Sequence, residues 1–144
     1  MKKNYTNNLG YWVKQFARLA NRAVDAELKP YGIGRTQWYI LHHTYHAEQL
    51  SQRSLQSLLQ VESATLTPLI SGLVRKGLIS QQADPRDKRG KIVVLSKEGL
   101  ALWQTLPDPI EIAKARALEG IPQADIEKAR VVLEQAVHNL EKEE

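Results

Sequence analysis

The sequence contains no cysteine, one methionine and one phenylalanine among its 144 residues. The absence of cysteine excludes disulfide bonds, thiolate metal sites, cysteine nucleophiles and regulation by thiol oxidation. No apolar run approaches the length of a membrane span, and the N-terminal stretch MKKNYTNNLGYW lacks the apolar segment of a signal peptide. We therefore expect a cytoplasmic protein that does not contact a membrane.

Negative charge is scarce in the first three quarters of the chain. Residues 1–106 hold 15 Lys and Arg against 7 Asp and Glu, a net of +8, whereas residues 107–144 hold 5 against 9, a net of −4. A basic body favours a polyanionic partner, and the acidic end favours a different role. A merely patchy, solvated surface is the alternative interpretation.

Helical periodicity accounts for most of the chain. Apolar residues at intervals of three and four predict a helix over residues 9–28, ended by Pro30, and a second helix from an N-cap at Thr36 to about Ala47. The first has the apolar stripe of a helix that packs against a partner. A final helix over about 123–140 carries a similar stripe.

The stretch LSQRSLQSLLQVESATLTPLISGLVRKG divides into two short helices joined by a turn. Ser51 or Ser54 can cap the first helix. The second spans about 63–76, and Gly77 follows it at the position of a left-handed C-terminal residue. These lengths and this spacing are typical of a helix-turn-helix.

A dense, mostly cationic segment comes next. Six of the eight residues from Asp84 to Lys91 are charged. Leu78-Ile79 and Lys91–Leu95 read as the two strands of a hairpin with this segment as its turn, and Ser96 caps the following helix, which Pro107 and Pro109 interrupt. A hairpin directly after a helix-turn-helix is typical of a wing, so we expect the charged turn to form its tip and to face nucleic acid.

These motifs resemble the MarR-type winged-helix transcriptional regulators. The wing motif stands here as Asp87-Lys88-Arg89 followed by Leu95-Ser96 and Gly99, with serine in place of the usual threonine. Upstream, Thr65-Leu66-Thr67 and Leu73 to Gly77-Leu78 match the recognition-helix pattern. The resemblance covers essentially the whole chain.

The resemblance implies a mainly α fold with a small β-hairpin wing. It divides one subunit into an N-terminal dimerisation helix (1–34), a winged helix-turn-helix (35–99) and C-terminal dimerisation helices (100–144). The implied function is that of a homodimeric, sequence-specific binder of double-stranded DNA, a repressor released by a small-molecule effector. A two-fold dimer would read a pseudo-palindromic operator.

The DNA-binding residues are expected on the outer face of the 63–76 helix and in the wing. Thr methyl and hydroxyl groups suit major-groove edges, and Arg89 suits a narrow minor groove, held by a charge-assisted bond to Asp87. An ordinary solvated face and a floppy charged turn are the alternatives. The predicted DNA-binding residues are Ser63, Ala64, Thr65, Thr67, Pro68, Ser71, Arg75, Arg86, Asp87, Lys88, Arg89 and Lys91.

Pro68 departs from the family pattern, in which arginine is common. Proline removes the N–H that would bond to Ala64, so we expect either a kink or an irregular first turn with regular helix only from about Pro68. The TLTPL string also resembles the branch of the family that senses hydroperoxides through cysteine, a mechanism that this chain cannot use.

Aromatic side chains suggest an effector pocket between the dimerisation helices and the winged domain, where the family often binds anionic aromatic compounds. The candidates are Trp12, Phe16, Trp38 and Tyr45, although aromatic stripes are also typical of plain core. His42 and His46 have the spacing of a zinc pair, with Glu48 or His138 as further ligands, but nothing places them together, and we assign no metal ligand and no cofactor.

No catalytic triad, phosphate loop or carboxylate pair is evident, so no enzyme is expected. Two other functions stay open. One is a zinc-responsive DNA-binding regulator, and the other is a winged-helix module for protein–protein assembly that does not bind DNA.

Overall fold

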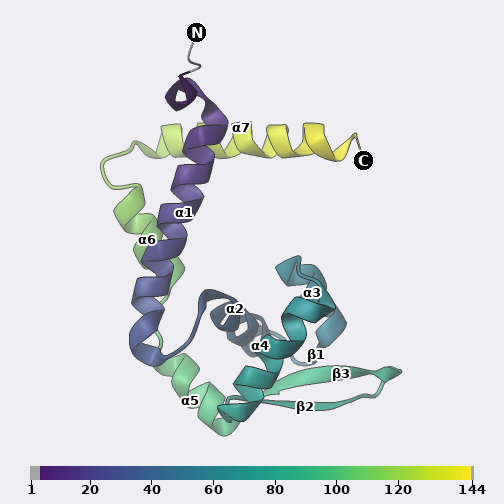
Figure 1. Cartoon of the computed structure of the whole chain (residues 1–144). Coiled ribbons are helices and arrows are strands. Elements are labelled where there is room, and N and C mark those ends of the chain that lie inside the picture. The colour runs from purple at the N-terminus through teal and green to yellow at the C-terminus, as the bar shows by residue number, and fades with distance from the viewer. Residues whose placement is uncertain (1–3, 144) are drawn as a thin grey trace. The chain divides into compact units, whose positions relative to one another are not determined.

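The computed structural model describes residues 4–143 and contains two compact units, residues 1–109 and 110–144. Each unit is considered by itself. The helices and strands follow one another in the order that Figure 1 shows. Their bounds are η1 Tyr5–Asn7, α1 Leu9–Leu28, η2 Lys29–Tyr31, α2 Arg35–His46, β1 Leu50–Ser51, α3 Gln52–Leu59, α4 Ser63–Arg75, β2 Ile79–Asp84, β3 Asp87–Leu95, α5 Lys97–Thr105, α6 Pro109–Ala117 and α7 Gln123–Glu141.

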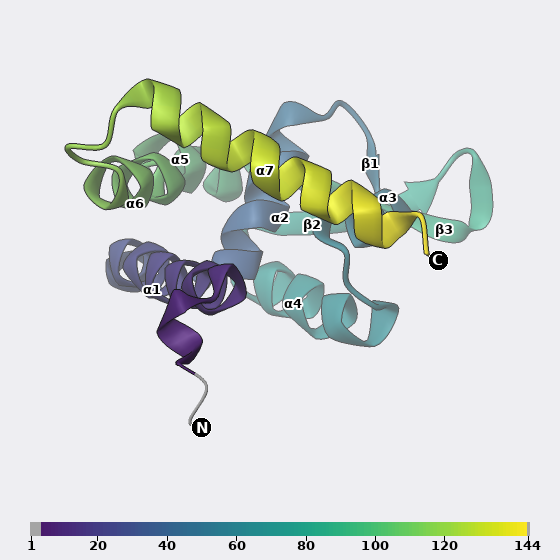
Figure 2. The same cartoon turned by 90° about the horizontal axis from the view of Figure 1, so that it is seen from above.

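Helix α2 is the centre of the first unit, because it contacts α1, α3, α4, α5 and β3 (Figures 1 and 2). Ile40 and Leu41 are therefore fully buried. The helix begins at Arg35, with Gly34 rather than Thr36 at the N-cap, and the Gln37 side chain accepts a hydrogen bond from the Gly34 N–H at 3.3 Å. The predicted cap at Thr36 is wrong because the helix already begins at Arg35, which places Thr36 within its first turn.

The helix-turn-helix is formed by α3 and α4 and is confirmed. The Ser51 hydroxyl caps α3 by accepting the Ser54 N–H at 3.0 Å. Gln60 closes α3 in the left-handed conformation, with φ of 54°. The apolar sides of the two helices form the core of the unit, in which four leucine and isoleucine side chains are almost fully buried: Leu55, Leu66, Ile70 and Leu73.

Pro68 does not disturb the start of α4, which is regular α-helix from Ser63. The expected irregular first turn is therefore wrong. Pro68 lies in the second turn with its ring exposed. The carbonyl of Ala64, which loses its usual intrahelical partner, belongs to an exposed residue and can bond to water. The proline thus occupies the outer face of the helix without interrupting it.

The wing is a longer hairpin than the sequence predicts. β3 is the central strand of an antiparallel sheet with the order β1-β3-β2, and β2 pairs with it from Ile79↔Leu95 to Ala83↔Lys91. The register then shifts, so that Asp84 pairs with Asp87 and residues 88–90 face no partner on β2. The tip is the turn at Pro85 and Arg86, and Arg89 lies on β3 behind it, so its predicted place at the tip is wrong.

A tight junction joins the end of the sheet to α5. The Ser96 hydroxyl accepts the Gly99 N–H at 2.9 Å and donates to the carbonyl oxygen of Gly77 at 2.5 Å. The Ser96 N–H donates to the carbonyl oxygen of Leu78 at 3.0 Å. Serine thus performs both tasks required of a hydroxyl residue at this position: it caps α5 and ties it to the end of α4.

The second unit consists of the greater part of α6, the loop after it and α7. Arg130 on α7 bonds to Glu127 and Glu134, which raises the pKa of its guanidinium and lowers that of the Glu127 carboxyl. Helix α7 buries no residue within this chain. Across residues 4–143, no helix combines the length and apolar character that a membrane span requires. The mainly α fold with a small β wing is confirmed.

Candidate nucleic-acid interface

All twelve residues predicted to bind DNA are exposed. On α4 this follows from the amphipathic pattern: Leu66, Ile70 and Leu73 point into the core, so the small polar residues of the helix lie on its outer side. The exposed face lacks the Lys and Glu typical of a purely solvated helix. Its small side chains leave room for close approach by another surface.

Thr67 projects from the middle of this face. Its hydroxyl donates to the carbonyl oxygen of Ser63 at 2.9 Å, so the proton is already used within the helix. The methyl group and the oxygen lone pairs remain for a partner. This chemistry suits a thymine methyl group or a base amino group in a major groove.

Asp84 and Asp87 shape the end of the wing. The Asp87 carboxylate accepts the backbone N–H of Arg89 at 3.0 Å, and Asp84 accepts that of Arg86 at 2.9 Å. Asp87 therefore holds Arg89 by a charge-assisted bond, as expected, although to the main chain rather than to the guanidinium. The Arg86 side chain donates to Gln49 at 3.2 Å, which ties the tip to the loop before β1.

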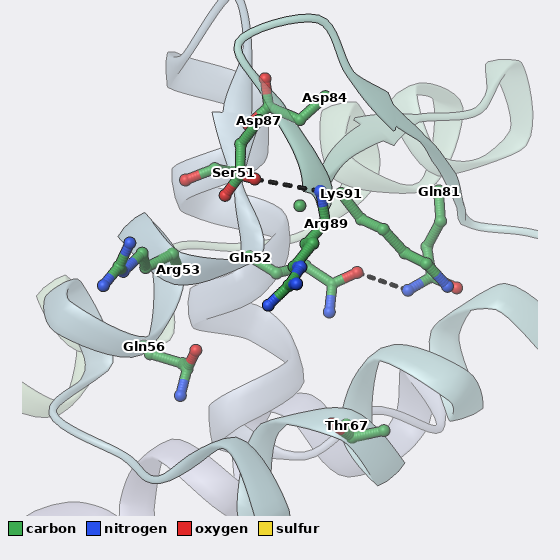
Figure 3. A pocket seen from close by; sticks show the side chains of 11 residues that line it. Ser51, Gln52, Arg53, Gln56, Thr67, Gln81, Asp84, Asp87, Arg89 and Lys91 are labelled. Atoms are coloured by element: carbon green, nitrogen blue, oxygen red, sulfur yellow. Dashed lines mark hydrogen bonds between the residues drawn. The ribbon is translucent and has the colours of Figure 1, made fainter.

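A cleft of about 530 Å³ separates the wing from α3 and α4. Figure 3 shows the Arg89 side chain descending into it, with Gln56 and Thr67 on the opposite side. We call this space the wing cleft. It is lined by Ser51, Gln52, Arg53, Gln56, Thr67, Gln81, Asp84, Asp87, Arg89, Gly90 and Lys91.

Arg53 and the three glutamines of the wing cleft are absent from the sequence-based prediction. A signal for Arg53 exists, because it is the only cation between Arg35 and Arg75 and lies at the start of the first helix of the helix-turn-helix. Gln81 carries no such signal. It reaches the cleft only because β2 extends beyond its predicted end and its amide bonds to Gln52 at 2.5 Å.

A second group of side chains surrounds Trp103 of α5. The Trp38 indole stacks on the His42 imidazole with centroids 5.2 Å apart, and Tyr45 lies 5.6 Å from Trp103. A pocket of about 170 Å³, here called the indole pocket, lies beside them. It is lined by Trp38, His42, His46, Trp103, Leu106, Pro107 and Asp108.

The predicted effector residues fall into two pairs. Trp38 and Tyr45 both lie against Trp103, and Trp38 lines the indole pocket. Trp12 and Phe16 lie on α1 and are 57% and 54% exposed, and Trp12 donates its indole N–H to the carbonyl oxygen of Thr6. The contacts of the Trp38 and Tyr45 rings are with α5 and with their neighbours on α2, not with these two residues.

The histidines of α2 form a cluster rather than a recognisable metal site. Burial lowers the pKa of His42, and repulsion by His46 and His43 lowers it further, against the attraction of Asp108. Burial, followed by repulsion from His46, also lowers the pKa of His43. Within the described part of the chain, no three His, Asp or Glu side chains are placed to hold a metal ion.

One sequence comparison matches the winged-helix part of this chain to a known family. The sequence model of the MarR family matches residues 31–90, from the end of η2 through both helices of the helix-turn-helix to the wing. This part of the chain, with the helix-turn-helix and the first part of the wing, is therefore similar to the MarR family. Within this stretch Asp87 fixes the main chain at Arg89, and just after it Ser96 with Gly99 forms the junction to α5.

Solved structures with the MarR fold extend the likeness to nearly the whole chain. MepR of S. aureus, solved with DNA, has 21% identity and a TM-score of 0.83 over 92% of this chain and 98% of its own. A MarR protein from Peptoclostridium difficile has 20% identity and a TM-score of 0.83 over 99% and 94%. CouR from Rhodococcus jostii, solved with p-coumaroyl-CoA, has 20% identity and a TM-score of 0.77 over 94% and 95%.

Proposed function

We propose that this protein is a sequence-specific, double-stranded DNA-binding transcriptional regulator that acts as a repressor in the cytoplasm. The observation that carries the proposal is the pairing of two exposed elements in one unit. Helix α4 offers small polar and methyl groups, and the wing beside it offers the cations Arg86, Lys88, Arg89 and Lys91. This pair suits a major groove and the neighbouring minor groove.

The similarity to MepR supports the proposal, because that protein was solved in complex with DNA. No arrangement of side chains in the described part of the chain calls for a reaction, so binding rather than catalysis is proposed. A winged-helix assembly module without DNA function is the main competing interpretation. An assembly function does not explain why the wing carries three cations within four residues, Lys88, Arg89 and Lys91.

The active form is proposed to be a homodimer. Helix α1 exposes Leu9, Trp12, Val13, Phe16 and Leu19, each more than 40% accessible. Helix α7 exposes Leu133, Val137 and Leu140 on one stripe. A monomer would leave these apolar surfaces in water, and a second copy can cover them. A two-fold dimer presents two winged units to a pseudo-palindromic operator.

Release from DNA is proposed to follow the binding of a small aromatic or anionic compound, as the fold of CouR with p-coumaroyl-CoA suggests. The indole pocket is the part of the first unit best suited to a planar ligand. The Trp38 indole N–H is buried without a hydrogen-bond partner, so a ligand acceptor would remove an unfavourable feature. A ligand that binds one dimer conformation better than the other would change DNA affinity.

The direct test is selection of bound fragments from genomic DNA, followed by binding of one selected duplex and one random duplex at several salt concentrations. A regulator should prefer the selected duplex by roughly a thousandfold or more and lose affinity steeply with salt. An assembly module should show no saturable binding to either duplex. Zinc and chelator added to the selected complex would separate a metal effector from an organic one.

A further inference from the structure

The wing cleft lies between the two elements that are proposed to enter different grooves. In duplex DNA a major groove and the adjacent minor groove are separated by one sugar–phosphate strand. If α4 occupies the first groove and the wing the second, this strand must pass between them. The cleft between Thr67 on α4 and Arg89 on the wing is therefore where a backbone phosphate would lie (Figure 3).

The chemistry of the cleft fits such a phosphate. Arg53 from α3 and Arg89 and Lys91 from β3 bring three cations to it, and Gln56 adds an amide. Arg53 and Arg89 come from α3 and from the wing. Figure 3 shows the Arg53 guanidinium turned away from Arg89, and a change of rotamer of this exposed side chain would let one phosphate accept from both guanidinium groups.

Asp84 and Asp87 also line the cleft, and their charge would oppose an anion. Both carboxylates are engaged by backbone N–H groups at the end of the wing, those of Arg86 and Arg89. Figure 3 shows the two aspartates at the end of the cleft away from Thr67 and Gln56. The end between Arg53, Gln56 and Thr67 thus has donors and no carboxylate.

Two side-chain bridges set the width of the cleft. Gln52 at the start of α3 bonds to Gln81 of β2 at 2.5 Å, and Gln49 accepts from Arg86 at 3.2 Å. Both join the wing to the segment around β1, whose backbone already pairs with β3 at Leu50↔Val93. These bonds and the strand pairing favour one spacing between the wing and α3 before any partner binds, which reduces the entropy lost on binding.

We propose that the wing cleft is a seat for one backbone phosphate of the DNA, held by Arg53 and Arg89, and that Gln52 is a positioning residue for it. The proposal rests on the DNA-binding function proposed above. It assigns Arg53 a role in affinity and none in sequence preference, since a phosphate carries no base identity.

The first measurement is DNA affinity of Arg53→Ala on the selected and the random duplex. Loss of one charge-assisted phosphate contact should weaken both by a similar factor, about tenfold per subunit. The slope of log affinity against log salt should become shallower by about one per subunit. Arg53→Lys should keep the slope and lose only part of the affinity, because lysine retains the charge without the planar fork.

Arg22→Ala is the matched control, because Arg22 is an exposed arginine on α1 and its loss changes the net charge equally. It should change affinity by less than about twofold at physiological salt, where charges beyond roughly 8 Å are screened. An equal loss in both variants would show that Arg53 acts only through net charge and would overturn the seat.

The second measurement replaces single phosphates of the selected duplex by uncharged methylphosphonates. At one position in each half-site the replacement should lower the DNA affinity of the wild-type protein. On the duplex with that replacement, wild type and Arg53→Ala should bind with equal affinity. If no position removes the difference between the two proteins, the phosphate seat is wrong. If Arg53→Ala binds like wild type while Arg89→Ala is weakened, the seat is wrong and the regulator function stands. If wild type binds no duplex, the function itself fails.

Gln52→Leu tests the positioning role. It removes no charge, so the salt slope should stay as in wild type while affinity for the selected duplex falls by about threefold to tenfold, the worth of one neutral hydrogen bond. Gln52→Glu retains an acceptor for the Gln81 amide. At high salt, where the added negative charge is screened, this variant should bind the selected duplex more tightly than Gln52→Leu does. Equal binding by wild type and Gln52→Leu would remove Gln52 from the proposal.

Discussion

Gly99 lies directly against the main chain of Leu78: a Cβ atom at position 99 would be 1.9 Å from the Leu78 carbonyl oxygen. The same carbonyl accepts the backbone N–H of Ser96 at 3.0 Å, and the Ser96 hydroxyl reaches the carbonyl of Gly77. The start of α5 is therefore fixed to the segment that joins α4 to β2. Any side chain at position 99 must separate these two segments.

We predict that Gly99→Ala lowers the free energy of unfolding by about 3 kcal/mol or more, because the clash is with main chain that cannot rotate away. Urea unfolding followed by circular dichroism measures it. Gly72→Ala is the control: its Cβ would meet only the ends of two flexible side chains, Gln37 at 3.4 Å and Arg75 at 3.9 Å, and alanine is favoured within a helix. A Gly99→Ala protein as stable as wild type contradicts the close contact.

Gln60 is the only residue other than glycine with positive φ in the part of the chain that the structure describes. Its left-handed conformation closes α3 and costs about 1 kcal/mol for a residue with a Cβ. We predict that Gln60→Gly raises the free energy of unfolding by about 0.5–1 kcal/mol and that Gln60→Val lowers it by at least as much. Thermal or urea unfolding of the two variants distinguishes these signs, and a stabilising valine would contradict the assignment.

The helices could be predicted because their apolar residues repeat at helical intervals. α1, α3, α4 and α7 begin and end within a residue or two of their expected positions, and Ser51 and Ser96 cap as expected. The cap at Gly34 was missed because glycine has no side chain to signal it. The irregular first turn expected from Pro68 was wrong because the exposure of the Ala64 carbonyl depends on the placement of the helix.

The wing and its cleft were harder to predict for a different reason. Ser80 to Ala83 are exposed and mostly polar, so no alternation marks them as a strand, and only the backbone pairing with β3 defines β2. β1 has two residues and forms for the same reason. The wing cleft depends on these pairings, since they bring Gln81 and Arg89 opposite Arg53, and a long-range register of this kind leaves no local pattern.

Stability should depend on pH through the histidines of α2. Burial and mutual repulsion lower the pKa of His42 and His43 from an ordinary value near 6.5. Below that value the unfolded chain binds more protons than the folded one, so stability falls as the pH decreases from about 6.5. Urea unfolding between pH 8 and 5.5 should show this loss, and His42→Gln should flatten it. Stability that rises toward pH 5.5 would contradict the lowered pKa values.

The dimer should depend on the apolar stripe of α7. Leu133 and Val137 are 40% and 53% exposed in the isolated chain, and paired aspartates there would place two charges in the proposed interface. Leu133→Asp with Val137→Asp should give monomer or insoluble protein by sedimentation. Gln135→Asp with Asn139→Asp adds the same charges at the same spacing on the other side of the helix and should stay dimeric. A stable dimer of the first variant removes α7 from the interface.

The two elements proposed to contact DNA, the wing and α4, should differ in how their mutations change DNA affinity. Arg89→Ala removes a charge from the wing, so we expect a loss of about 1–3 kcal/mol per subunit on the operator, part of which also appears on random duplex. The salt slope should become shallower by about one per wing. Arg89 is at an exposed position, so the fold should survive its replacement.

Replacement of Thr67 should leave the slope of log DNA affinity against log salt unchanged, because this side chain carries no charge. Its hydroxyl proton is already donated to Ser63, so the methyl group is the part left for a thymine. Thr67→Val, which keeps a methyl group in that position, should therefore retain base preference better than Thr67→Ala, which should relax it at particular base pairs. Salt titrations of operator and random duplex, with single-base variants of the operator, measure both effects. If Arg89→Ala matches wild type in affinity and slope, the wing does not read DNA, and the assembly module becomes the better interpretation of this chain.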